Sequence, residues 1–136
     1  MKRTFVDTYF YLALLDPRDA DHERAKEISE KLEGDTVTTQ WVLTEVGDAL
    51  CSAADRPRFL ALLDVIDTDG KVTVVAADAS WFDRGLDLYR RRPDKEWSLT
   101  DCISFAVMEE ERIREALTAD VHFEQAGFIA LLRDNG

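Results

Sequence analysis

Four carboxylic acids stand where an apolar run ends or where a helix is expected to begin. They are Asp7, Glu45, Asp101 and Asp120. A carboxylate belongs on the protein surface unless it caps a helix, pairs with a charge or binds a metal. Carboxylates that lie close together repel one another unless protons or a cation neutralise them. Mg²⁺ prefers oxygen ligands, so a shared location for the four acids predicts a divalent metal site suited to phosphodiester hydrolysis.

The elements that must bring these acids together alternate along the chain. The sequence predicts strands over residues 2–6, 36–38, 72–77, 116–118 and 128–132. It predicts helices over 9–15, 22–33 and 40–54, then from 57 to a turn at 69–70, from 78 or 80 to 92, and from 98 to about 114. Such alternation is typical of an α/β fold, with a mostly parallel sheet covered by helices on both faces.

The order of these elements places the acids at one edge of the sheet. Ligands in parallel sheets bind beyond the carboxyl ends of the strands. Asp7 follows the first expected strand and Asp120 follows the fourth, while Glu45 and Asp101 are expected in the first turns of helices. We therefore expect one acidic site at this edge.

Composition limits the possible functions. The chain has 136 residues, of which 46% are apolar, so we expect a single domain over residues 1–136 with a real core. The net charge of −11 argues against binding nucleic acid over the whole surface, so any such contact must be local. The sequence has no apolar stretch long enough for a membrane span and no signal-peptide pattern, which predicts a cytoplasmic protein. We expect Cys51 and Cys102 to be small core side chains rather than metal ligands.

Each acid also has a purely structural interpretation. Asp101 completes a capping box with Ser98, and Asp120 can begin an Asx turn. Glu45 can be a solvated residue on the surface of a helix. Asp7 is the hardest to explain in this way, because it follows an apolar strand and precedes an aromatic helix.

The strings around the acids resemble the signatures of the PIN-domain family. They are Phe5-Val6-Asp7-Thr8, Glu45 in the third helix, Ser98-Leu99-Thr100-Asp101-Cys102-Ile103-Ser104-Phe105-Ala106, and Leu117-Thr118-Ala119-Asp120-Val121-His122-Phe123. The resemblance covers nearly the whole chain and is closest to the VapC-type ribonuclease toxins of prokaryotic toxin–antitoxin pairs. It implies a three-layer α/β/α sandwich with about five strands, and an endoribonuclease that depends on Mg²⁺ or Mn²⁺. It also implies a homodimer and a cognate antitoxin protein that enters the active-site groove.

The resemblance assigns roles to individual residues. Asp7, Glu45, Asp101 and Asp120 are implied to be the catalytic, metal-coordinating acids, and Thr8 with Thr100 or Thr118 are implied to orient ligands or water. The chain departs from the family pattern at Tyr9, where many relatives have a small residue, and at His122, where some have a further acid. Tyr9 is expected to reshape the groove. His122 is expected to weaken binding of a second metal ion.

Two further features have both a functional and a structural interpretation. His122 can contact a phosphate or assist proton transfer, or it can simply be hydrogen-bonded. A basic region can be an RNA track or a dimer contact, or the solvated end of a helix. This region contains Arg84, Arg90, Arg91, Arg92 and Lys95.

Three rival functions can be weighed against the nuclease. A phosphorylation receiver domain needs a pair of adjacent acids after the first strand, but Val6 and Thr8 flank Asp7. A haloacid-dehalogenase-type phosphatase needs a second aspartate at the position of Tyr9. The rival that stays open is a PIN-like module without catalytic activity that serves dimerisation or partner binding, because a fold by itself does not fix a function.

Overall fold

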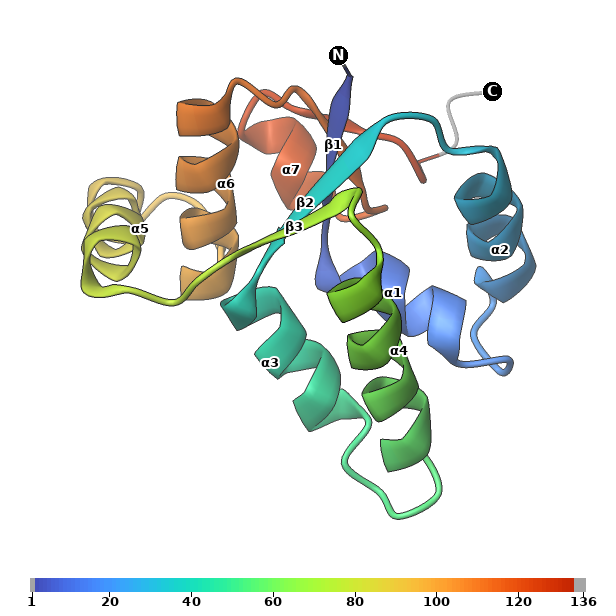
Figure 1. The fold of residues 1–136 in the computed structure, drawn as a ribbon. Coiled ribbons are helices and arrows are strands. Elements are labelled where there is room, and N and C mark those ends of the chain that lie inside the picture. Colours follow the sequence, from blue (N-terminus) through green and yellow to red (C-terminus); the bar gives the residue numbers. More distant parts are fainter. Residues whose placement is uncertain (1, 134–136) are drawn as a thin grey trace.

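The structure, a computed structural model, describes residues 2–133 and contains a parallel sheet between layers of helices (Figure 1). Its strands are β1 (Arg3–Val6), β2 (Asp35–Thr39), β3 (Val72–Val75), β4 (Glu115–Leu117) and β5 (Ile129–Ala130). Its helices are α1 (Thr8–Leu15), α2 (His22–Lys31), α3 (Gln40–Ala49), α4 (Arg56–Thr68), α5 (Ala79–Arg91), α6 (Leu99–Glu111) and α7 (Val121–Gln125).

The strand order puts β1 in the centre of the sheet. The order is β3-β2-β1-β4-β5, and each neighbouring pair is parallel. The chain builds the sheet outward from β1 to β3, then crosses back through α5 and α6 to place β4 on the other side of β1. The strand order therefore reverses between β1 and β4. In parallel sheets such a reversal opens a crevice at the carboxyl ends of the strands, where ligands bind.

The helices lie on both sides of the sheet, as the alternation predicts. Figure 1 shows α5 and α6 on one side and α1 and α2 on the other. Phe5 and Val37 from neighbouring strands are almost fully buried, and the rings of Phe105 on α6 and Phe123 on α7 meet edge to face with centroids 4.9 Å apart. The predicted α/β/α fold is confirmed, and the sheet is entirely parallel rather than mostly so.

Several local predictions were wrong. The third helix ends at Ala49 instead of Ala54, because Ser52 and Asp55 hydrogen-bond to each other through side chain and backbone and so favour a turn over a helix. Cys51, in the loop after this helix, is exposed, whereas Cys102 is buried as expected. The last strand is only two residues long.

The short helix α7 was not predicted. Asp120 caps it by accepting a hydrogen bond from the backbone N of His122 at 2.9 Å, and Phe123 anchors it in the core. Five residues are too few for a helical period to be recognised in the sequence. The predicted Asx turn at Asp120 is present as this same hydrogen bond from His122, and it also caps the helix, which was not predicted from the sequence.

Gly85 sets the distance between α5 and α6, the helix that carries Asp101. A Cβ at this position would overlap Cγ1 of Ile103 and lie 3.0 Å from its Cα. We expect Gly85→Ala to lower the free energy of unfolding by about 1–3 kcal/mol, because one of the two helices must move. Denaturant unfolding checks this result. The control is Gly70→Ala, whose new Cβ has no neighbour within 4 Å, and an equal effect of both substitutions would contradict the prediction.

Candidate active site

Asp7 lies at the carboxyl end of the central strand and points across the sheet. It precedes α1, but its side chain does not cap that helix. Instead, Thr118 Oγ1 donates a hydrogen bond to Asp7 Oδ2 at 2.9 Å, and the same hydroxyl accepts one from the backbone N of Asp120 at 3.0 Å. Asp7 is only 6% exposed. Thr118 therefore ties the acids that follow β1 and β4 together at the point where the strand order reverses.

The environment of Asp7 opposes its ionisation. Burial raises the pKa of its carboxyl to about 7, and the negative charges of Asp101 and Glu45 push in the same direction. The hydrogen bond from Thr118 acts against this shift, because it stabilises the charged form. A carboxyl group whose pKa is raised this far by burial and neighbouring charges is typical of a functional site.

Glu45 approaches the same place from α3. It lies in the second turn of this helix, one turn later than expected, and it is half-buried. Thr8 Oγ1 donates a hydrogen bond to Glu45 Oε1 at 2.5 Å. Burial raises the pKa of Glu45, a hydrogen bond from Thr8 lowers it, the charge of Asp101 raises it, and a hydrogen bond from Thr100 lowers it.

Asp101 is held by the start of α6. The predicted capping box is present: Asp101 N donates to Ser98 Oγ at 3.0 Å, and Ser98 N donates to Asp101 Oδ2 at 3.1 Å. Burial raises the pKa of Asp101, and the charge of Asp120 adds to the shift. The capping interpretation is thus correct for Asp101, and it does not exclude a functional role. The cap fixes the direction in which the carboxylate points.

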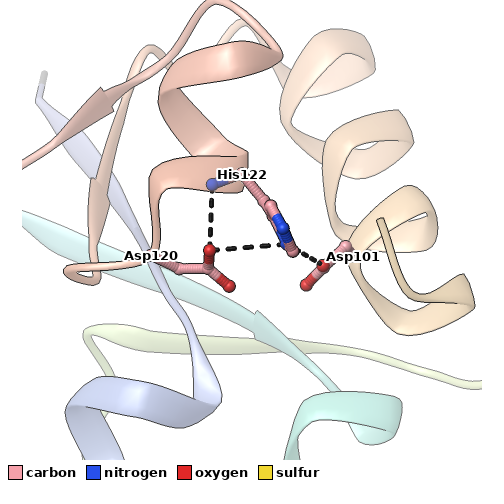
Figure 2. A group of neighbouring side chains, drawn as sticks. All are labelled: Asp101, Asp120 and His122. Carbon is pink, nitrogen blue, oxygen red and sulfur yellow. Dashed lines mark hydrogen bonds and ion pairs between the residues drawn. The ribbon is translucent and has the colours of Figure 1, made fainter. Parts of the chain in front are cut away.

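His122 lies between two of the acids. Its Nδ1 is 3.2 Å from Asp101 Oδ2 and 3.4 Å from Asp120 Oδ1 (Figure 2). Together these three side chains offer ligand atoms that all lie within 4.8 Å of one another. The prediction that His122 is hydrogen-bonded is confirmed, whereas a contact with phosphate or a role in proton transfer stays a prediction.

The four acids form one connected cluster, which we call the acidic site. Thr118 links Asp7 to the backbone of Asp120, and His122 contacts both Asp120 and Asp101. Thr8, the neighbour of Asp7 in the chain, binds Glu45. Their common location at the carboxyl edge is therefore confirmed, and their catalytic role stays a prediction. The donor set fits a hard divalent cation, because it consists mainly of carboxylate oxygens whose mutual repulsion a cation relieves.

Two predicted features contact residues outside the acidic site. Tyr9, 37% exposed, donates a hydrogen bond from its hydroxyl to Asp21 at the start of α2, and this bond raises the pKa of Tyr9 to about 12. Its effect on the groove stays a prediction. In the basic region, Arg84, Arg91 and Arg92 form ion pairs with Glu110, Asp87 and Asp94. This pairing favours the helix-end interpretation, and an RNA or dimer contact there stays a prediction.

Replacing Thr118 tests how the acids are held. We expect Thr118→Val to weaken Mn²⁺ binding at pH 7 by about tenfold, because the loss of its hydroxyl leaves the charged form of Asp7 less stable and Asp120 less firmly oriented. Calorimetric titration measures the affinity. Thr4→Val is the matched control, since Thr4 is equally buried and its hydroxyl has no hydrogen-bond partner among the described residues. Equal affinities for wild type and Thr118→Val would show that the Thr118 hydroxyl, which links Asp7 to Asp120, does not contribute to metal binding.

Comparison with known proteins identifies the family. Residues 4–129 match the PIN domain. The chain is 31% identical to the "23S rRNA-specific endonuclease VapC20" of Mycobacterium tuberculosis over 126 residues. This alignment covers 92% of this chain and 95% of the relative. The crystal structure of VapC20 from this organism, described as a sarcin-ricin loop cleaving toxin, superposes with a TM-score of 0.84 at 29% identity over 93% of this chain and 96% of that one.

Two more distant structures share the fold alone. FitAcB from Neisseria gonorrhoeae matches with a TM-score of 0.63 at 16% identity, over 93% of this chain and 94% of that one. VapBC2 from Rickettsia felis, solved with a DNA fragment from its promoter, matches with a TM-score of 0.66 at 11% identity, over 94% of this chain and 96% of that one. In the described part of the chain, we find no helix with the length and apolar character needed to cross a bilayer. The predicted resemblance is confirmed, and the chain belongs to the PIN-domain family.

Proposed function

We propose that this protein is a metal-dependent endoribonuclease that hydrolyses RNA phosphodiester bonds. The observation that carries the proposal is the acidic site itself: four carboxylates from separate parts of a PIN domain meet where the strand order reverses. Burial, and after it the negative charges of neighbouring acids, raises the pKa of Asp7, Glu45 and Asp101, so folding holds these three carboxyl groups in an environment that opposes their ionisation. The similarity to an RNA endonuclease over nearly the whole chain supports RNA as the substrate.

The proposed metal ligands are Asp7, Glu45, Asp101 and Asp120. A bound Mg²⁺ or Mn²⁺ supplies an activated water and stabilises negative charge on the phosphate and the leaving oxygen. The protein holds the ligands in place: Thr118 orients Asp7, Thr8 orients Glu45, and helix caps orient the other two acids. The side chain of Asp120 is 32% exposed, so RNA can approach the site from this side, whereas Asp7 is buried beneath it.

We further propose that the protein is the toxin of a VapBC-type pair. Its similarity to VapC20, which is described as a toxin, supports this role. The expected partners are a cognate antitoxin that blocks the active-site groove and a second copy of the chain. Light scattering on the purified protein tests the homodimer, which should have twice the mass of one chain.

The decisive experiment is RNA cleavage by the purified protein without antitoxin. Total RNA and intact ribosomes are incubated with Mn²⁺ or Mg²⁺, with a chelator control, and the new 5′ ends are mapped. Ribosomes are included because VapC20 is described as specific for 23S rRNA. We expect metal-dependent cuts at defined positions. If the protein binds metal but cuts none of these RNAs, the proposal of an endoribonuclease fails. If it neither binds metal nor cuts RNA, the non-catalytic PIN-like binding module is favoured.

A further inference from the structure

The acidic site contains one nitrogen atom in a position where a metal ligand is expected. His122 Nδ1 faces Asp101 Oδ2 at 3.2 Å and Asp120 Oδ1 at 3.4 Å. Figure 2 shows the imidazole ring projecting from α7 into the space between these two carboxylates. The three side chains are 27%, 13% and 32% exposed in the order His122, Asp101 and Asp120. An ion from solvent can therefore reach them.

The separations agree with those of neighbouring ligands around one ion. Octahedral Mg²⁺ has bonds of about 2.1 Å, which places adjacent ligand atoms about 3 Å apart. The distances from Nδ1 to the two carboxylate oxygens exceed this value by only a few tenths of an ångström. Binding an ion between these atoms thus needs only small side-chain movements.

Regular elements hold all three ligand atoms. The capping box at the start of α6 fixes Asp101, and the cap of α7 fixes Asp120. The backbone N of His122 donates to the carboxylate of Asp120 at 2.9 Å, so this histidine and this acid are held by the same turn. Phe123, the next residue, is completely buried and anchors α7 against the core. Regular structure therefore places the backbone of His122, and its ring contacts both carboxylates.

We infer that His122 is a metal ligand alongside the carboxylates, and that it shifts the preference of the site from Mg²⁺ towards Mn²⁺. Imidazole nitrogen is a softer donor than carboxylate oxygen and suits transition-metal ions, whereas Mg²⁺ favours oxygen. In the hydrogen bond to Asp101, Nδ1 carries the proton, because an ionised carboxylate only accepts. Metal binding would release this proton to solvent and leave a neutral ring with its proton on Nε2, so that the Nδ1 lone pair faces the ion. This inference rests on the proposed function, because it concerns the metal of that same active site.

Pulsed electron paramagnetic resonance of bound Mn²⁺ tests the ligand directly, because a coordinated imidazole nitrogen couples to the electron spin. The experiment uses the full chain without a histidine tag. The chain has two histidines, which makes His22→Gln a matched control; His22 lies on α2, where its Nδ1 contacts the carbonyl oxygen of Ala13. We expect nitrogen coupling in the wild type and in His22→Gln, and its loss in His122→Asp.

Calorimetric titration with Mn²⁺ and Mg²⁺ measures the preference without any enzymatic assay. We expect His122→Asp to lower the ratio of Mn²⁺ to Mg²⁺ affinity roughly tenfold, and His22→Gln to leave it unchanged. If circular dichroism shows that His122→Asp does not fold, His122→Gln replaces it in both measurements.

The outcomes separate this inference from the proposed function. Mn²⁺ binding without nitrogen coupling, or an unchanged affinity ratio in the His122 variant, overturns the role of His122 and leaves a carboxylate-only nuclease intact. If wild-type protein binds Mg²⁺ but no Mn²⁺, only the inference is overturned. If it binds neither ion, both the inference and the metal-dependent nuclease are overturned.

Discussion

Asp7→Asn is expected to lower the rate of metal-dependent RNA cleavage by about two orders of magnitude or more, because it removes a charged ligand at the centre of the acidic site. Asparagine has nearly the same shape as aspartate, and its carbonyl oxygen can still accept the hydrogen bond from Thr118. The fold should therefore persist. Initial cleavage rates at saturating Mn²⁺ measure the effect, and circular dichroism checks the fold.

Asp48→Asn is a matched control for this loss. Asp48 lies on α3, as Glu45 does, and its charge contributes to the raised pKa of Glu45, but Asp48 is exposed to solvent. Its replacement should leave the cleavage rate within about twofold of wild type, because an exposed charge is screened by water and salt. Asp7 is not an essential metal ligand if Asp7→Asn keeps more than a tenth of the wild-type rate.

Metal-free protein is expected to become less stable as the pH rises from about 4 to about 8. The folded-state pKa of Asp7 is about 7 and its ordinary value is 3.8. The folded state thus holds a proton that the unfolded state has already lost, and stability falls as the pH rises through this window. The titration of Asp7 lowers the free energy of unfolding by at most on the order of 4 kcal/mol. The pKa values of Glu45 and Asp101 are also raised, so both act in the same direction.

Denaturant unfolding at pH 4 and pH 8 measures this loss of stability in the presence of a chelator. Asp7→Asn should flatten the pH dependence, which makes the variant more stable than wild type at pH 8 without metal. Millimolar Mn²⁺ should make the wild type more stable than the variant, because the ion stabilises only the folded protein whose ligands are intact. Identical pH dependence in the two proteins would falsify the raised pKa of Asp7.

The order of strands and helices could be predicted because each element leaves a local pattern in the sequence. Val72 to Val75 is rich in β-branched residues and forms a strand, and Ser98 with Asp101 forms the predicted cap of α6. Boundaries were less certain where a local hydrogen bond competes with a helix, as at Ser52. The helix α7 escaped prediction because it is stabilised by the burial of Phe123 rather than by a repeating pattern.

The sequence by itself determined which acids this protein has, in what local setting each stands, and that they follow elements of an α/β fold. Only the tertiary structure decided that β4 pairs with β1, so that Thr118 meets Asp7 across 111 positions of the chain. It also decided how deeply Asp7 is buried and that His122 lies between two acids. Local patterns encode the period of an element and its caps. Strand order, burial and the resulting pKa values depend on contacts between distant segments, which no single stretch of sequence contains.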